Sequence, residues 1–463
     1  MVDVSQLKLV HVVGIGGAGM SAIARILHGK GIEVSGSDLQ ESPILNSLRD
    51  EGICVTLGHT AQCVGKVDLV LASSAIPDDN VELIFARESG IPVQTRPEFL
   101  TDLTAGYDVI AVAGAHGKTT VTAMLTQALI AADLDPTFII GGVATNLNTN
   151  AHCGSSSYFV IEADEYRNTF LALSPKIAVI TNIEYDHPDC FPSMGHVRLA
   201  FGKFADNIRT QGLLVACYDD RVGHVVAASY HASGGRVVLY GSAGRDTLEW
   251  QAHHIAPNAS GGMTFSVTHR SRVLGEVSLQ IPGDYNALNA LAVIAVATEL
   301  GIPWETVRDV LAAYQGTARR FEYMGEQNGI VVIDDYAHHP TQIAGVIKAA
   351  QQRYPGRRII AAWEPHTFSR IKALYGDFMG AFTEADAVVI LPIYAAREED
   401  DESITVSNLK DDMQHPKVSS ANSLEHAVDI LTRLVAPGDV VVMMGAGKEY
   451  VVGQSLLAVL GES

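Results

Sequence analysis

Short apolar runs alternate with helix-like stretches along most of this chain. This alternation is typical of parallel β-sheets covered by helices, because a parallel strand is buried on both faces and its crossover to the next strand needs a helix-sized connection. Apolar residues make up 47% of the 463 residues, which is enough to form buried cores. At roughly 150 residues per domain, this length suggests about three domains. We therefore expect a three-domain α/β protein.

The predicted strands fall into three blocks, which predict domains of residues 1–106, 107–316 and 317–463. The first is expected to be a Rossmann-like domain, with strands at 7–13, 32–37 and 68–73. The second is expected to be a central P-loop ATPase domain with a parallel sheet, formed by runs at 108–114, 158–161, 177–182 and 212–217. Short alternating runs between 247 and 280 predict a small antiparallel sheet appended to it. The third is expected to be a second Rossmann-like α/β domain, with strands at 330–333, 358–363, 387–391 and 439–444.

Charge and cysteine content exclude several classes of protein. The formal net charge is −20 and no basic run occurs, so we do not expect nucleic acid as a partner. The first ten residues do not resemble a signal peptide, and no run of about 20 uninterrupted apolar residues predicts a membrane span. The five cysteines include no CxxC pair, so we expect reduced thiols in a cytoplasmic protein.

A first glycine-rich loop follows the first predicted strand. Gly14, Gly16, Gly17 and Gly19 lie in a GxGxxG pattern that opens a helix-like stretch, and Asp38 follows the next strand. Such glycines let the backbone approach a diphosphate at a helix N-terminus, so the pattern predicts a nucleotide site. The alternative is that these glycines serve only tight packing between strand and helix.

A second glycine-rich loop lies between a strand and a helix at the start of the central block. It reads Gly114, Ala115, His116, Gly117, Lys118, Thr119, Thr120, although Val112 stands where the Walker pattern has its first glycine. Amide groups of such a loop surround triphosphate oxygens, while the lysine neutralises them and the threonine binds magnesium. Two phosphate loops disfavour a simple dehydrogenase, because one nucleotide would supply energy while the other would be part of the substrate.

Acidic residues follow two strands of the central block. Glu162, Asp164 and Glu165 follow one strand, and Glu184 to His187 follow another. Active groups of open parallel sheets gather at these carboxyl ends, so both clusters could meet the loop at Lys118 and form a magnesium site, with Glu162 as the preferred ligand. For Asp164 and Glu165 the alternative is a solvated strand end, and for His187 a hydrogen-bonded loop histidine.

Polar clusters also follow two strands of the third block. The first runs from Asp334 to Pro340 and the second from Trp363 to Arg370. Such a density of His, Asp and Arg suits a binding surface better than a core. His366 and Arg370 could hold a carboxylate, the arginine through two hydrogen bonds.

Taken together, these motifs resemble those of the Mur ligase family across essentially the whole chain. The resemblance also rests on the segments 181–187 (TNIEYDH), 283–289 (GDYNALN) and 319–321 (RRF). It implies an ATP-dependent ligase that adds L-alanine to UDP-N-acetylmuramate through an acyl phosphate in cytoplasmic peptidoglycan precursor synthesis, as a monomer or homodimer. Two alternatives remain: a recycling ligase that attaches a preformed tripeptide to the same sugar nucleotide, and a catalytically silent nucleotide-binding scaffold.

The resemblance also implies roles for individual residues. The first domain would bind the UDP end of the sugar nucleotide rather than NAD, through Gly14, Gly16, Gly17, Gly19, Asp38 and Ser74. ATP would bind the loop from Gly114 to Thr120 together with Asn286, Asn289, Arg320 and Asp335. Mg²⁺ would be held by Thr119, Glu162 and His187, with Lys118, Glu162 and His187 as catalytic residues. The amino acid would lie near His338, His366 and Arg370.

Three positions depart from the pattern familiar in proteobacterial members of the family. Ala115 replaces a usual threonine, Thr367 stands where an arginine is common, and Lys448 follows Gly447 where an aspartate is usual. The missing basic side chain at Thr367 leaves the grip on the amino acid open.

Overall fold

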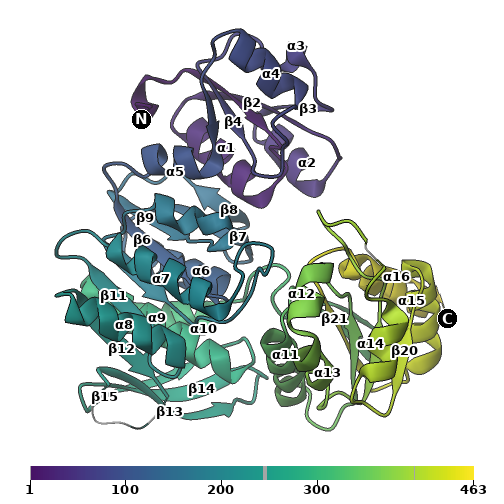
Figure 1. Ribbon diagram of the computed structural model, residues 1–463. Coiled ribbons are helices and arrows are strands. Elements are labelled where there is room, and N and C mark those ends of the chain that lie inside the picture. Colours follow the sequence, from purple (N-terminus) through teal and green to yellow (C-terminus); the bar gives the residue numbers. More distant parts are fainter. Residues whose placement is uncertain (1, 243, 245–247, 401, 463) are drawn as a thin grey trace. The chain divides into compact units, whose positions relative to one another are not determined.

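The computed structural model describes residues 2–242, 244, 248–400 and 402–462. Met1, Thr247 and Ser463, which bound predicted segments, lie outside the described residues. The chain divides into two compact units. The first contains the chain up to Ile183 together with Arg198–Tyr240 and Ala292–Val310, and the second contains Glu184–Val197, Gly241–Leu291 and the chain from Leu311 onward. Figure 1 shows the elements of both.

A five-stranded parallel sheet opens the first unit. Its strands are β1 (Leu9–Val13), β2 (Glu33–Asp38), β3 (Cys54–Leu57), β4 (Leu69–Ala72) and β5 (Val93–Thr95), in the order β3-β2-β1-β4-β5. The accompanying helices are α1 (Ala18–Gly29), α2 (Pro43–Asp50), α3 (Ala61–Val64), α4 (Val81–Glu88) and α5 (Arg96–Leu103). The strand order reverses beside β1, so the first glycine loop lies at the switch point where such sheets bind ligands. The expected Rossmann-like architecture is confirmed.

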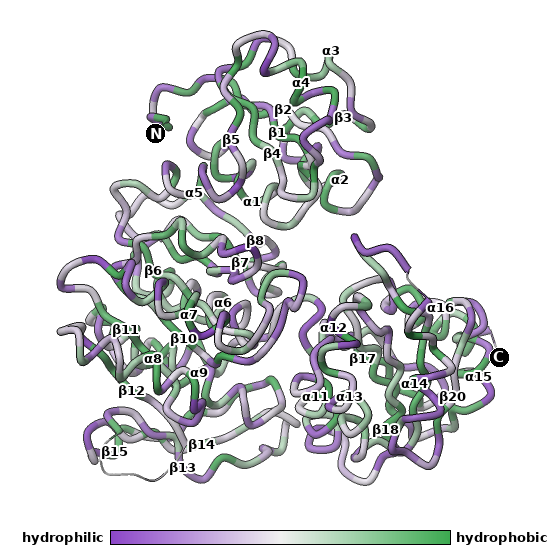
Figure 2. Tube along the Cα trace, viewed as in Figure 1, coloured by the Kyte–Doolittle hydropathy of each residue, from purple (hydrophilic) through white to green (hydrophobic). Residues whose placement is uncertain are grey.

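The second sheet of this unit has β6 at its centre. From β6 (Asp108–Ala113) the order runs one way through β10 (Ile177–Ile180), β11 (Leu213–Cys217) and β12 (Arg236–Gly241). The other way it runs through β9 (Tyr158–Glu162), β7 (Thr137–Ala144) and β8 (Thr149–His152), and β8 is antiparallel. The helices along this stretch are α6 (Lys118–Ala131), α7 (Met194–Asp206) and α8 (Arg221–Ala232). The four predicted strands are β6, β9, β10 and β11, and the hydropathy colouring of Figure 2 shows the apolar character of these central strands.

The predicted antiparallel segment is present in the second unit. Strands β13 (Trp250–Pro257), β14 (Met263–His269) and β15 (Arg272–Ser278) form a meander, with β14 pairing antiparallel to both neighbours. The turn between β13 and β14 contains Asn258, whose Oδ1 accepts the amides of Ser260 and Gly262. Helices α9 (Asp284–Glu299) and α10 (Trp304–Ala313) follow along the chain.

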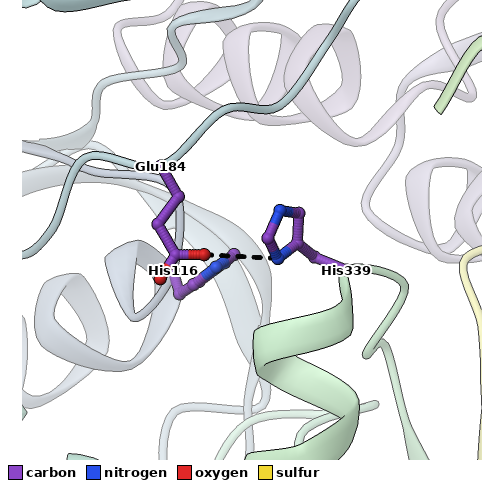
Figure 3. Close-up of side chains that lie close together, drawn as sticks. All are labelled: His116, Glu184 and His339. Atoms are coloured by element: carbon purple, nitrogen blue, oxygen red, sulfur yellow. Dashed lines mark ion pairs between the residues drawn. The ribbon is translucent and has the colours of Figure 1, made fainter. Parts of the chain in front are cut away.

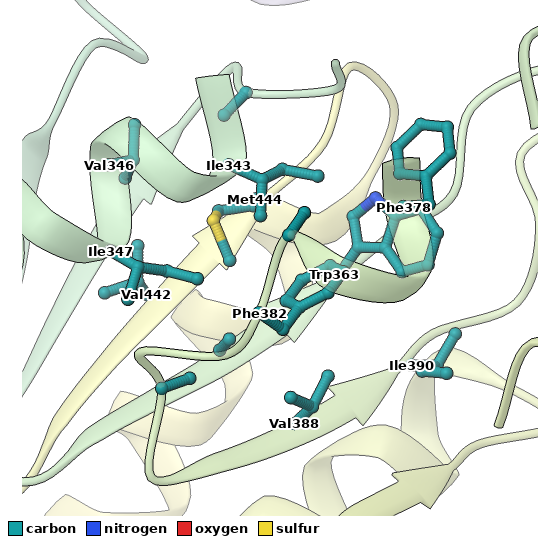
Figure 4. Close-up of a cluster of buried hydrophobic side chains, with 14 of the residues drawn as sticks. Ile343, Val346, Ile347, Trp363, Phe378, Phe382, Val388, Ile390, Val442 and Met444 are labelled. Carbon is teal, nitrogen blue, oxygen red and sulfur yellow. The ribbon is translucent and has the colours of Figure 1, made fainter. Parts of the chain in front are cut away.

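The third sheet lies in the second unit and has the order β16-β17-β21-β18-β19-β20. Its strands are β16 (Glu322–Gln327), β17 (Ile330–Asp335), β18 (Ile359–Trp363), β19 (Ala387–Ile390), β20 (Val418–Ser420) and β21 (Val440–Met444). Its helices are α11 (Pro340–Arg353), α12 (Phe368–Ala373), α13 (Tyr375–Gly380), α14 (Val406–Asp412), α15 (Leu424–Leu434) and α16 (Glu449–Glu462). Figure 4 shows Trp363 packed against Phe378 and Phe382 in the core that covers one face. The four predicted strands of the third block are confirmed.

The remaining expectations concern cysteines and membrane spans. The five cysteines are free, and Cys217 is buried on β11. Burial raises the pKa of the Cys217 thiol to about 11, so this thiol stays protonated. Within the described ranges, no helix combines the length and the apolar character that crossing a membrane requires.

Candidate functional site

The second glycine loop is held in a fixed conformation by the end of β10. Ala115 N and His116 N donate to the Asn182 carbonyl (3.1 Å) and side-chain oxygen (2.9 Å), and Thr181 Oγ1 donates to the His116 carbonyl (2.5 Å). Gly114 has a φ of +142°, and a Cβ there would lie 2.0 Å from Thr181 Oγ1, so only glycine fits. The loop leads into α6, whose first turn carries Lys118 and Thr119. This is the strand–loop–helix context that the sequence predicted for a triphosphate site.

Lys118 is a charged group held at this loop. Its Nζ donates to the Gly114 carbonyl (2.6 Å) and lies 2.8 Å from Glu165 Oε2. Burial lowers the pKa of Lys118, but Glu165, Asp164 and Glu162 outweigh burial and raise it above the ordinary value. The side chain of Glu165 is only 4% exposed, so the solvated reading of this residue is wrong. The first acidic cluster therefore does face Lys118, as the sequence predicted.

Glu162 and Thr119 offer the oxygen donors that suit Mg²⁺. Glu162 ends β9, and its Oε2 accepts the amide of Gly141 on β7 (2.8 Å), which fixes the orientation of the carboxylate. A Cβ at Gly141 would lie 2.3 Å from that oxygen. Thr119 is 5% exposed at the N-terminus of α6. A carboxylate and a hydroxyl are hard oxygen ligands, so these two residues fit a magnesium ion. His187, the third expected ligand, belongs to the second unit.

The first glycine loop has the features expected of a diphosphate site. Gly16 N donates to Asp38 Oδ2 (2.9 Å), and the Ser37 carbonyl accepts the amides of Gly14 (2.8 Å) and Ile15 (3.0 Å). Gly14 has a φ of +78°, with Ser73 Cβ only 3.0 Å from the position of an added Cβ. Gly17 is the N-cap residue of α1 and makes no side-chain cap hydrogen bond, so the loop leads directly into a helix N-terminus, where an anion is stabilised. The expected diphosphate site at Gly14, Gly16 and Asp38 is therefore supported by a tight glycine turn that leads into a helix N-terminus.

Arg96 also borders this loop. A Cβ at Gly19 would lie 2.6 Å from Arg96 Cζ, so a guanidinium packs against the first turn of α1, where an anion is favoured. The sequence analysis missed Arg96, because an arginine that opens a helix 77 positions after Gly19 carries no local signal. Ser74 is exposed, and its carbonyl accepts Arg167 Nη1 (3.2 Å).

In the second unit, a buried ion pair joins the segment after β10 to α12. Arg370 Nε lies 2.7 Å from Asp186 Oδ1, and the two side chains are 3% and 6% exposed. Burial raises the pKa of Asp186, but Arg370, His187 and His338 outweigh burial and hold it well below the ordinary value. Arg370 Nη1 lies 2.7 Å from His366 Nδ1. Arg370 Nε, which was expected to help bind a substrate carboxylate, therefore binds Asp186 instead.

His338 and His366, which the sequence analysis expected near the amino-acid substrate, lie together. Their ring centroids are 5.8 Å apart, and His338 Nε2 lies 3.9 Å from Asp186 Oδ2. Burial and the neighbouring Arg370 hold the pKa of His338 well below its ordinary value and lower that of His366 to about 3. Both imidazoles are thus uncharged at neutral pH, so they can exchange hydrogen bonds with an amine without repelling it.

His339 has a different role from its neighbour. Its Nδ1 lies 3.3 Å from Glu184 Oε2, the ion pair drawn as a dashed line in Figure 3. Its Nε2 lies 3.2 Å from the Tyr185 carbonyl, and its side chain caps α11 together with Gln342. His339 therefore fastens the helix to the 184–187 segment.

The four other residues expected at ATP form two separate groups, Asp335 with Arg320 and Asn286 with Asn289. Asp335 accepts the amides of Phe321 and Ala337 (both 2.8 Å), and burial raises its pKa to about 6, which Arg320 opposes. The Arg320 guanidinium lies 5.1 Å from the Tyr336 ring centroid. Asn286 and Asn289 are buried and bonded to each other (3.0 Å), and Asn286 also donates to the Pro282 carbonyl. These two asparagines therefore shape the start of α9.

The neighbouring Arg319 holds two acids, Asp334 and Glu449, and the sequence analysis did not single out Glu449. It hydrogen-bonds Glu449 and lies 3.3 Å from Asp334 Oδ2, and its guanidinium lies 5.0 Å from the Tyr336 ring centroid. Glu449 is fully buried at the start of α16. Burial raises the pKa of Asp334 to about 7, against the effect of Arg319.

The structure shows the surroundings of two positions that depart from the family pattern, Thr367 and Lys448. Thr367 is 3% exposed with a φ of +62°, and its amide donates to the Tyr394 carbonyl (3.0 Å). A longer side chain would have to leave this buried position. Lys448 contributes its backbone amide to Glu364 Oε2 (2.9 Å), a bond that any residue could make.

Comparison with known proteins gives matches along nearly the whole chain. Three family models match: "Mur ligase family, catalytic domain" at residues 9–108, "Mur ligase middle domain" at 112–297 and "Mur ligase, glutamate ligase domain" at 319–447. The UDP-N-acetylmuramate–L-alanine ligase of Frankia casuarinae is 41% identical, with 98% of each chain covered. The protein of the same name from Clostridium acetobutylicum is 39% identical over 97% of this chain and 98% of its own.

Solved structures give the same picture. The crystal structure of UDP-N-acetylmuramate-alanine ligase from Thermotoga maritima matches with a TM-score of 0.81 and 27% identity, covering 99% of this chain and 100% of that chain. A murein peptide ligase from Psychrobacter arcticus matches with a TM-score of 0.75 and 26% identity, covering 98% and 99%. The three-domain α/β fold expected from the sequence is confirmed by these matches.

Proposed function

The chain belongs to the Mur ligase family, and from this premise we propose that it is an ATP-dependent ligase that joins L-alanine to the carboxylate of UDP-N-acetylmuramate. Relatives about 40% identical over almost their whole length carry that name. The observation in the structure that supports this best is the pair of glycine loops within the first unit, one of which holds the cationic Lys118. Two loops of this kind suit one nucleotide as energy source and a second as part of the substrate.

The proposed reaction has two steps. A carboxylate oxygen of the muramyl group attacks the γ-phosphorus of ATP, the bond to the β–γ bridging oxygen breaks, and ADP leaves. The amine of alanine then attacks the acyl carbon, phosphate leaves, and the nitrogen loses a proton to give the amide. Positioning and electrostatics supply most of the acceleration in such phosphoryl transfers.

The residues of the central loop would serve the first step. Lys118 would lie at the ATP phosphates, where its charge stabilises the transferred group. Thr119, Glu162 and His187 would hold Mg²⁺, which when bound offsets negative charge between the phosphates and the acceptor. Gly14, Gly16 and the α1 N-terminus would bind the UDP diphosphate, with Arg96 beside them. His338, His366 and Arg370 would lie near the incoming amine, with Asp186 orienting the arginine.

A panel of amine acceptors tests the function. Phosphate release would be measured with ATP, Mg²⁺ and UDP-N-acetylmuramate, against alanine, glycine, serine and the free tripeptide. We expect release to require the sugar nucleotide and to be fastest with alanine. Release without the sugar nucleotide would refute the assignment. A pocket discriminates alanine from glycine or serine by only about 1 to 3 kcal/mol. Slower turnover with glycine and with serine is therefore compatible with the proposed alanine ligase.

The recycling ligase is the second candidate, because a murein peptide ligase also matches nearly the whole chain. Preference for the tripeptide over alanine in the same panel would favour it. A silent scaffold would release no phosphate with any acceptor. We further propose that the protein works in cytoplasmic peptidoglycan precursor synthesis as a monomer or homodimer, with domain boundaries near 106 and 316.

A further inference from the structure

A buried carboxylate lies beneath the first glycine loop. Glu82, in the first turn of α4, is 0% exposed and contacts three other elements. Ser37 Oγ on β2 donates to its Oε2 (2.6 Å), and Thr60 N donates to its Oε1 (3.1 Å). Two imidazoles approach the same Oε2: His59 Nδ1 at 3.2 Å and His11 Nε2, on β1, at 3.5 Å. Glu82 thus connects elements that are far apart in the sequence.

This carboxylate is held in its ionised form. Burial favours the protonated acid, but the contact with His11 and the hydrogen bonds from Ser37 and Thr60 outweigh burial and hold the pKa of Glu82 below its ordinary value. A buried charge is a poor way to stabilise a fold, since well-packed apolar residues of similar volume are often as good or better. Such a charge instead fixes one arrangement of the groups that bind it.

Those groups in turn hold the glycine turn. The Ser37 carbonyl accepts the amides of Gly14 and Ile15, and Asp38, the next residue, accepts the amide of Gly16. Ser37 is itself 0% exposed, and its hydroxyl is bound on one side by Glu82 and on the other by His59 Nδ1 (2.9 Å). A path of direct contacts therefore runs from Glu82 through Ser37 to the backbone of the turn.

We propose that Glu82 is a positioning residue for the sugar nucleotide: through Ser37 it fixes the backbone of the first glycine turn, and so the N-terminus of α1 that follows the turn, in the geometry that receives the diphosphate. Glu82 touches no substrate. The inference rests on the proposed function, because it takes UDP-N-acetylmuramate as the ligand of this loop.

Glu82→Gln in the full chain tests the inference. The substitution keeps the shape of the side chain and removes the charge that Ser37 and the two imidazoles bind. We expect the KM for UDP-N-acetylmuramate to rise about tenfold or more, because small misplacements of binding groups have effects of this size. The KM for ATP and the kcat at saturating sugar nucleotide should stay within about twofold, as ATP is assigned to the other loop. Glu88→Gln, an exposed position on the same helix, is the matched control.

Ser37→Ala keeps the test decisive if Glu82→Gln does not fold. It removes only the hydroxyl that links Glu82 to the turn, so it should raise the KM for UDP-N-acetylmuramate in the same direction, and calorimetric titration with that compound alone should show the matching loss of affinity. Unchanged sugar-nucleotide affinity in a folded Ser37→Ala protein would overturn the inference, as would equal losses for ATP. A wild-type protein that neither binds UDP-N-acetylmuramate nor releases phosphate with it would instead refute the proposed function.

Discussion

Glu364 carries a proton that the unfolded chain would release. It directly follows β18, is 2% exposed, and its Oε2 accepts the Lys448 amide. Burial and its hydrogen bond with Glu449 raise the pKa of Glu364 from 4.5 to about 8. Glu364→Gln has the same shape as the protonated acid and can donate an N–H in place of its O–H. The variant should therefore keep the hydrogen bonds and lose the titration.

The sign and size of the effect follow from linkage. A group whose pKa is raised on folding contributes most below its unfolded value and loses that contribution as pH rises to the folded value, here from 4.5 to about 8. Each pH unit in this window is worth about 1.4 kcal/mol, so at pH 7 the wild type is less stable than at pH 4.5 by at most about 3 kcal/mol from this group. The free energy of unfolding of Glu364→Gln should therefore exceed that of the wild type by up to this amount at pH 7, with the difference vanishing near pH 4.5.

Urea unfolding of the full chain between pH 5 and 8.5 measures this difference. Tryptophan fluorescence is a suitable probe, because the buried Trp363 immediately precedes Glu364. Glu462→Gln, an exposed position on α16, is the control and should follow the wild type at every pH. A difference between Glu364→Gln and wild type that does not grow with pH would refute the reasoning.

Three further predictions concern charged residues of the site. Lys118→Ala should lower the rate of phosphate release by about 100-fold or more. It should also lower the midpoint of thermal unfolding, because it leaves the buried Glu165 carboxylate without its cation. Adding Glu165→Gln should restore that midpoint but not the activity. Glu162→Gln should raise the Mg²⁺ concentration for half-maximal phosphate release, and an unchanged magnesium titration would exclude it as a ligand. Arg370→Ala should lower the urea-unfolding free energy by about 3 to 5 kcal/mol, because it leaves Asp186 unpaired, and adding Asp186→Asn should recover part of that loss.

The parts of the fold that the sequence predicted are those with strong local signals. Strands β10 and β21 are buried along their whole length and β6 after its first residue, so their apolar runs are unmistakable. The glycine loops depend on residue types at fixed spacing. Strand β3 is exposed or half-buried along its length, and β5 and β20 have three residues each. Such strands are defined by their pairing with a neighbour, which no local pattern records.

The site was predicted in the same uneven way. Residues at the carboxyl end of a buried strand, such as Glu162 and Asp335, stand where open sheets place their active groups, so position alone singled them out. Glu165 was assigned only a weak role and proved to be the partner of Lys118. Glu82 and Arg96 were missed, because in sequence they are ordinary charged residues of short helices.

What these less visible residues share is a partner distant in the chain. Glu82 binds Ser37 across 45 positions, Glu165 binds Lys118 across 47, Glu449 binds Arg319 across 130 and Asp186 binds Arg370 across 184. Three of the four pairs place a buried acid against a cation near an expected ligand. A cation held in this way keeps its charge and a fixed direction without water, which is the preorganisation that phosphate and carboxylate chemistry requires. The conformation of each cation is thus set by an acid that need not touch the ligand, so substituting the acid should change ligand affinity even where every contacting residue is intact.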